Sequence, residues 1–198
     1  MMHAVIQFLE DKESLKGVDR EFRKLVEQFH HIPFCATFGV SCAGHFYETG
    51  PDDEITPDSF YTIPHGMLDI IIDPESSHIP LLVALIEQVV AKHADCTFKP
   101  IKHIFSPPHA SRLQIWEIRI NDNGSLDSMG ERYYGGYKPI IGNLEAYARN
   151  KQRNLEIIGF WKDLERAVGK YCRENGFTVF DLPKRIEEFK TLWNPQNE

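Results

Sequence analysis

The sequence predicts an α+β protein in which helices pack on a mixed β-sheet and a long helix follows near the C-terminus. Three observations support this class. An amphipathic helix precedes an apolar strand early in the chain, and a strand, a helix and a strand then follow in succession, which predicts a crossover between parallel strands. A long helical pattern comes last. We therefore expect a sheet domain over 1–124, a Gly/Tyr-rich loop over 125–142 and a helical part over 143–198 that packs on the same domain.

Composition limits the kind of protein this can be. The chain has 198 residues, of which 42% are hydrophobic and 26% charged, as is usual for soluble globular proteins. Its formal net charge of -7 argues against nucleic-acid binding, which normally depends on a basic surface. The apolar segment 1–9 is short and has no basic region before it, so it indicates a first strand rather than a targeting signal. Four cysteines without a signal peptide indicate a reducing compartment, and we expect a cytoplasmic protein without membrane contact.

Residues 14–30 form the first predicted helix. Apolar residues recur at spacings of three and four and define one face: Leu15, Val18, Phe22, Leu25, Val26 and Phe29. Pro33 ends the helix, because the residue before a proline is driven out of the helical conformation. From Phe34 to Val40 apolar residues alternate with small or polar ones, which predicts a strand. This strand leads into Ser41-Cys42-Ala43-Gly44-His45, called here the corner.

The middle of the chain contains the predicted crossover. A strand region covers 60–73, and the Pro-His-Gly sequence at 64–66 indicates a kink or bulge near its start. The segment 76–90 is mostly apolar and predicts a helix that is largely buried. Strands over 97–105 and 112–120 follow, and the Pro-Pro turn between them predicts an antiparallel pair.

A long helix is predicted over 143–174, with Asn175 and Gly176 at its C-terminal cap. Gly159 and Gly169 are possible breaks in it. Its apolar stripe could pair two copies of the chain, and it consists of Leu144, Tyr147, Leu155, Ile158, Trp161, Leu164, Val168 and Tyr171. A non-enzymatic interaction protein, a homodimer built on this helix, is therefore one functional alternative.

The corner is the candidate functional site. Cys42 places a thiol near the imidazole of His45, and Gly44 allows a ligand or another backbone segment to approach closely. A cysteine and a histidine can form a nucleophile with its base, or supply two ligands of a zinc or iron site. Because two ligands do not complete such a site, we assign no metal ligands. The structural alternative makes Cys42 a small buried hydrophobe and His45 a hydrogen-bonded turn residue.

Other polar residues can converge on the corner. Asp69 interrupts an apolar strand and, if buried, needs a partner, for which Arg119 and His65 are the candidates. Glu117 and Arg119 share one face of their strand, either as an anion-reading pair or as a surface ion pair. The candidate catalytic residues are Cys42, His45 and His65. The candidate ligand-binding residues are Ser41, Gly44, Asp69, His103, Arg119 and Tyr134, the last from a segment that could close as an aromatic lid.

The helix, the strand and the Ser41-Cys42-Ala43-Gly44-His45 sequence together resemble the start of the wybutosine-synthesising tRNA methyltransferase family. They also resemble small uncharacterised bacterial and phage proteins with a Ser-Cys-x-Gly-His strand end. In the tRNA enzymes the corner reads Ser-Ser-Cys-Ser-Gly-Arg, so Val40, Ala43 and His45 differ here. The resemblance covers at most residues 14–120. It implies an α/β fold with a pocket at the corner and adenosylmethionine-linked chemistry on RNA.

These observations predict a small-molecule or nucleotide pocket at the corner, with the substrate, the cofactor and the reaction left open. If the protein is an enzyme, Cys42 or a metal-bound water is the nucleophile, His45 or His65 the general base, and Arg119 the anion clamp. Two alternatives stay open: a homo-oligomeric interaction protein that uses the helix over 143–174, and a zinc or iron site at Cys42 and His45.

Overall fold

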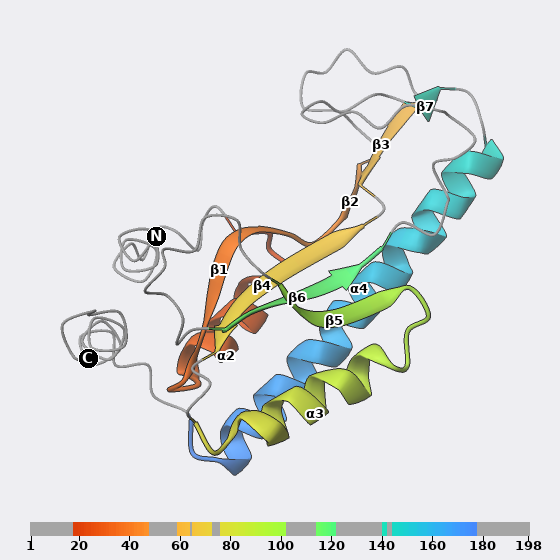
Figure 1. Ribbon diagram of the computed structural model, residues 1–198. Coiled ribbons are helices and arrows are strands. Elements are labelled where there is room, and N and C mark those ends of the chain that lie inside the picture. The colour runs from red at the N-terminus through yellow and green to blue at the C-terminus, as the bar shows by residue number, and fades with distance from the viewer. Residues whose placement is uncertain are drawn as a thin grey trace.

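A computed structural model describes residues 18–47, 59–63, 65–72, 76–101, 114–121, 140–141 and 144–177 (Figure 1). The elements in chain order are α2 (Arg23–His31), β1 (Cys35–Cys42), β2 (His45–Tyr47), β3 (Ser59–Ile63), β4 (Gly66–Ile72), α3 (Ile79–Val90), β5 (Cys96–Ile101), β6 (Gln114–Ile120), β7 (Ile140–Ile141) and α4 (Leu144–Glu174). The predicted first strand over 1–9 and most of the predicted loop over 125–142 lie outside the described residues.

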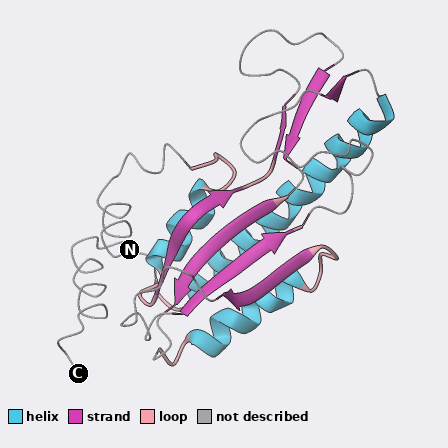
Figure 2. Cartoon of the chain, turned by 45° about the horizontal axis from the view of Figure 1, so that its top comes forward, coloured by secondary structure: helices cyan, strands magenta, loops and turns pink. Residues whose placement is uncertain are grey.

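The predicted α+β class is confirmed. A four-stranded sheet has the order β1-β4-β6-β5, and a smaller three-stranded sheet has the order β2-β3-β7. Helices α2, α3 and α4 lie together on one side of the four-stranded sheet (Figures 1 and 2). The smaller sheet extends beyond it, beside the first turns of α4 (Figure 1).

Among the described residues, the sheet is antiparallel rather than mixed, although the predicted crossover is present. Strands β4 and β5 run in the same direction, as predicted for the two strands joined through α3. They are not neighbours, however, because β6 lies between them and pairs antiparallel with both. Strand β1 also pairs antiparallel with β4, so every neighbouring pair in this sheet is antiparallel.

The strand region predicted over 60–73 forms two strands, β3 and β4, which belong to different sheets, so the expected kink or bulge is a break between them. The sequence between them is where the chain passes from one sheet to the other. Gly66 is the first residue of β4, and its surroundings leave no room for a side chain. A Cβ atom there would lie 2.9 Å from Cζ2 of Trp161 and 3.0 Å from the backbone oxygen of Ala43. The glycine therefore permits close packing at the junction.

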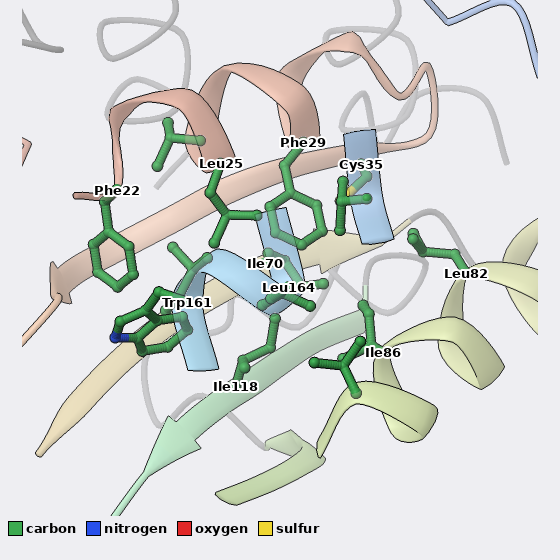
Figure 3. Packing of buried hydrophobic residues seen from close by; sticks show 14 of the residues in the cluster. Phe22, Leu25, Phe29, Cys35, Ile70, Leu82, Ile86, Ile118, Trp161 and Leu164 are labelled. Carbon is green, nitrogen blue, oxygen red and sulfur yellow. The ribbon is translucent and has the colours of Figure 1, made fainter. Parts of the chain in front are cut away.

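The core lies between the helices and one face of the four-stranded sheet (Figure 3). In β4 the alternate residues Leu68, Ile70 and Ile72 point to the helices, as the period of two in a strand requires. Figure 3 shows Phe22, which precedes α2, and Leu25 and Phe29 of α2 meeting Ile70, Trp161 and Leu164 across this layer. The predicted stripe is confirmed for Leu25, Val26 and Phe29, which are buried on α2, whereas the described residues 18–22 of the predicted 14–30 helix precede α2 and are not helical.

Helix α3 differs from its prediction. It begins with Pro80 in its first turn, as expected, but only one face is buried, through Leu82, Ile86 and Val89. Leu81, which lies outside this face, is 61% exposed. Most residues of α3 are apolar, but only the side of the helix that faces the sheet is buried.

Helix α4 closely matches the predicted 143–174 helix and is continuous through both glycines. It ends before Gly176, whose φ of 72° is the left-handed conformation expected of a C-terminal cap. The later residues of its apolar stripe are buried in the chain's own core: Trp161, Leu164, Val168 and Tyr171. Among the helices that the structure describes, none has both the length and the apolar character needed to cross a membrane.

Candidate functional site

The corner joins the two sheets. Strand β1 ends at Cys42, and β2 of the smaller sheet begins at His45 (Figure 1). Gly44 between them has a φ of 83°, a left-handed conformation that residues with a Cβ atom rarely adopt. Gly44 was predicted to allow a close approach, and the backbone conformation at this position also favours glycine.

Three distant segments hold the backbone of the corner. The amide of Ala43 donates to Oδ2 of Asp19 at 2.8 Å, just before α2. The carbonyl of Ala43 accepts a hydrogen bond from Nε1 of Trp161 in α4, also at 2.8 Å. Gly66 of β4 lies against the same peptide groups. Ala43 is buried, so these contacts satisfy polar atoms that water does not reach.

Cys42 is half-buried, and burial raises the pKa of its thiol above the ordinary value. The nearby carboxylate of Asp19 also raises this pKa, while a backbone hydrogen bond from Gly44 opposes the shift. A nucleophilic cysteine normally has a lowered pKa, so this surrounding does not favour a thiolate. The catalytic role of Cys42 stays a prediction, and it would require a change in these surroundings when a ligand binds.

The raised pKa of the Cys42 thiol can be tested by measuring how fast the thiol is alkylated. Because the thiolate is the reactive form and its pKa is raised, iodoacetamide should modify Cys42 more slowly at pH 7.5 than it modifies glutathione. The rate should increase as the pH rises past 9, since deprotonation then becomes possible. Cys35 and Cys42 share the tryptic peptide 25–92, so tandem mass spectrometry of that peptide would assign the rate to Cys42 and separate it from the other three free cysteines. If iodoacetamide modified Cys42 faster than it modified glutathione at pH 7.5, the raised pKa would be contradicted.

Strand register places charged residues next to the end of β1. Directly opposed residues of neighbouring strands project to the same side of a sheet. The Cα pairings define one row as Cys42, Met67, Arg119 and Thr97, and the next as Asp69, Glu117 and Lys99. In β4 and β6 these residues alternate with those that point to the helices, so they lie on the opposite face. We call Met67, Asp69, Lys99, Glu117 and Arg119 the charged face.

The charged face has carboxylates at its base and cations at its rim. Asp69 and Glu117 are directly opposed and both are buried. Oε1 of Glu117 lies 3.8 Å from Nζ of Lys99, and Oε2 lies 3.9 Å from a terminal nitrogen of Arg119. The side chains of Lys99 and Arg119 are 58% and 41% exposed, against 11% for Glu117. The two cations offset the repulsion expected between directly opposed carboxylates.

Both ion-pair distances exceed the length of a hydrogen bond. The donors of Lys99 and Arg119 are therefore not engaged by Glu117, although the charges attract. In this arrangement the guanidinium and the ammonium can still donate to an anionic group that approaches from the rim.

The structure brings together part of the predicted site. The candidates that lie on adjacent strands are Cys42, Asp69 and Arg119. His65 is exposed between β3 and β4. The backbones of Ser41 and His45 lie in β1 and β2, but their side chains are outside the description, as are residues His103 and Tyr134 altogether. Lys99 was not predicted as a site residue, and Glu117 was noted only for sharing a face with Arg119.

Metal binding at the corner stays a prediction. Among the described residues there is no group of three or more histidine, cysteine, aspartate or glutamate side chains that could hold a metal ion. The predicted alternative of zinc or iron depends on His45, whose side chain lies outside that search.

No family model, no curated protein and no solved structure matches this chain. The fold and the charged face define an α+β protein with an antiparallel sheet that has helices packed on one side and charges grouped on the other. The resemblance to the wybutosine-synthesising methyltransferases accordingly stays a proposal.

Proposed function

We propose that the protein binds a small polar molecule on the charged face, beside the end of β1. The observation that carries the proposal is the register that opposes Asp69 and Glu117 on adjacent strands, two positions from Cys42's partner Met67. Lys99 of β5 lies beside the carboxylate of Glu117. Buried carboxylates with cations at the rim can read both donors and acceptors of a ligand.

The neighbouring row on the same face supports a functional reason for these charges. Its residues Ala36, Ile71 and Ile115 are directly opposed, apolar and buried. Apolar side chains are therefore accommodated on this face, and burying charges there instead costs desolvation energy. Buried charges that stability does not require mark functional sites more often than other positions.

The predicted pocket at the corner is contiguous with this surface, because Cys42 pairs with Met67. A nucleotide is one possible ligand, and adenosylmethionine is another on the basis of the resemblance. If the protein is an enzyme, Arg119 is the anion clamp, and His45 or His65 is the base. The interaction-protein alternative has less support, because most of the described stripe of α4 packs within the chain, with Leu155 as an exposed exception.

Amide shifts in NMR spectra of the full chain test the proposal. Pools of nucleotides, sugar phosphates, amino acids and adenosylmethionine should include a component that shifts the amides of Met67, Glu117 and Arg119. Replacing Arg119 with alanine should weaken that binding about tenfold or more, since it removes a charge-assisted contact. Lys170→Ala, an exposed change on α4, is the control and should leave binding unchanged. If no component shifts these amides, or if the Arg119 variant binds normally, the proposal is wrong.

A further inference from the structure

We infer that the contact between the Asp19 carboxylate and the corner is autoinhibitory: it holds the Cys42 thiol unreactive, and its release makes that thiol available as a nucleophile. The contact joins the turn before α2 to the amide of Ala43, the residue after Cys42, at 2.8 Å. The inference goes beyond the proposed function and does not depend on which ligand the charged face binds.

The peptide groups of Ala43 are held from two sides, and the two contacts differ in kind. The carbonyl accepts from the indole of Trp161, which is neutral, fully buried and part of a continuous helix. The amide donates to Asp19, which is only partly buried and lies in a non-helical turn closed by a hydrogen bond from the amide of Phe22. The Asp19 contact can therefore open by rotation of one side chain, whereas the Trp161 contact can open only if the core moves.

The charge of Asp19 opposes ionisation of the Cys42 thiol. Burial has the largest effect on the pKa of this thiol and raises it, a backbone hydrogen bond from Gly44 lowers it, and the carboxylate of Asp19 raises it. If Asp19 moves away, the Gly44 amide still favours the thiolate while the repulsion from the carboxylate is removed. Release of the contact therefore shifts the thiol toward its reactive form.

The same contact limits access to the sulfur. Ala43 and Gly44 are buried, and Cys42 beside them is half-buried. A buried amide without an acceptor is unfavourable, so water must reach Ala43 when Asp19 leaves it. Water at Ala43 also exposes the neighbouring sulfur and lessens the burial that raises its pKa. Release of Asp19 thus acts on the thiol in two ways, through charge and through access.

Two substitutions in the full-length protein separate these effects. Asp19→Asn keeps an oxygen that can accept from Ala43 and removes the charge, whereas Asp19→Ala removes both. Iodoacetamide should alkylate Cys42 at pH 7.5 about two- to fivefold faster in Asp19→Asn, and faster still in Asp19→Ala, because a larger thiolate fraction outweighs the accompanying loss of nucleophilicity. The pH–rate profile of Asp19→Asn should also move to lower pH, which a purely structural role of Asp19 would not cause.

Two controls accompany these rates. Glu21→Gln removes an exposed carboxylate from the same turn and should leave the rate and the pH profile of Cys42 unchanged. Cys35 is fully buried and should stay unmodified while Cys42 reacts, which tandem mass spectrometry of their shared tryptic peptide would show. If Cys35 reacted together with Cys42 in Asp19→Ala, unfolding would explain that rate, and Asp19→Asn alone would decide the question.

The outcomes are independent of the proposed function. If Asp19→Asn left the alkylation rate and the pH profile of Cys42 unchanged, or if Glu21→Gln altered them equally, the autoinhibitory contact would be refuted. Because these measurements use iodoacetamide and no ligand, that result would leave the binding function of the charged face to be decided by the amide shifts of Met67, Glu117 and Arg119.

Discussion

Replacing Trp161 with alanine should lower the free energy of unfolding by about 3–5 kcal/mol, the range for deleting a large aromatic side chain from a core. Trp161 is fully buried in α4 and packs edge-to-face on Phe22, the residue before α2, with ring centroids 4.6 Å apart. It also contacts Phe160 at 4.5 Å and donates a hydrogen bond to Ala43 at the corner. Alanine would remove all of these contacts and leave a cavity, which urea denaturation followed by circular dichroism would report.

Trp161→Phe separates packing from the hydrogen bond. Phenylalanine keeps an aromatic ring between α2 and β4 but leaves the buried carbonyl of Ala43 without its donor, at a cost of about 1–3 kcal/mol. Leu155→Ala on the same helix is the control, because Leu155 is 58% exposed and its loss should change stability by roughly 0.5 kcal/mol or less. If Trp161→Phe were as stable as the wild type, the indole would not be what holds the corner in place.

The sequence predicted that the three described helices exist, because each depends on local periodicity, but it placed the start of α2 too early and α3 too deep in the core. The stripes of α2 and α4 are visible at spacings of three and four, and Gly176 identifies the end of α4. Strand order could not be obtained in the same way. The insertion of β6 between β4 and β5 depends on pairing between distant segments. The Pro-His-Gly sequence before β4 is compatible both with a kink in one strand and with a passage between two sheets.

The candidate site was also predicted only in part, because some of its residues become neighbours only through the pairing of distant strands. Alternation alone places Glu117 and Arg119 on one face of their strand, and that prediction is confirmed. The neighbours that give this face its chemistry, Asp69 and Lys99, are defined only by register across three strands. At the corner, the short motif indicated reactivity, whereas one of its backbone hydrogen bonds comes from Trp161, 118 residues later in the chain.

Arg153 provides the second large effect expected on stability. Its side chain is almost completely buried on α4, where it forms ion pairs with Asp95 at 3.0 Å and Glu156 at 3.1 Å and donates to the carbonyl of Asn121. Asp95 immediately precedes β5 and Asn121 immediately follows β6, so one guanidinium ties α4 to the adjacent ends of two strands. Arg153→Met keeps the apolar stem but removes the charge. We expect a loss of about 1–3 kcal/mol, because Asp95 and Glu156 are partly exposed and can be hydrated while the carbonyl of Asn121 loses its donor.

Arg166→Met on the same helix is the matched control for this change. Arg166 also pairs with a carboxylate, that of Asp163, but its side chain is 76% exposed. An exposed pair contributes about 0–1 kcal/mol and is screened by salt, whereas a buried one is screened much less. Urea denaturation in low and high salt should therefore show a large, salt-insensitive loss for Arg153→Met and a small, salt-dependent loss for Arg166→Met. Equal losses for the two variants would mean that the ends of β5 and β6 are held to α4 by apolar packing alone.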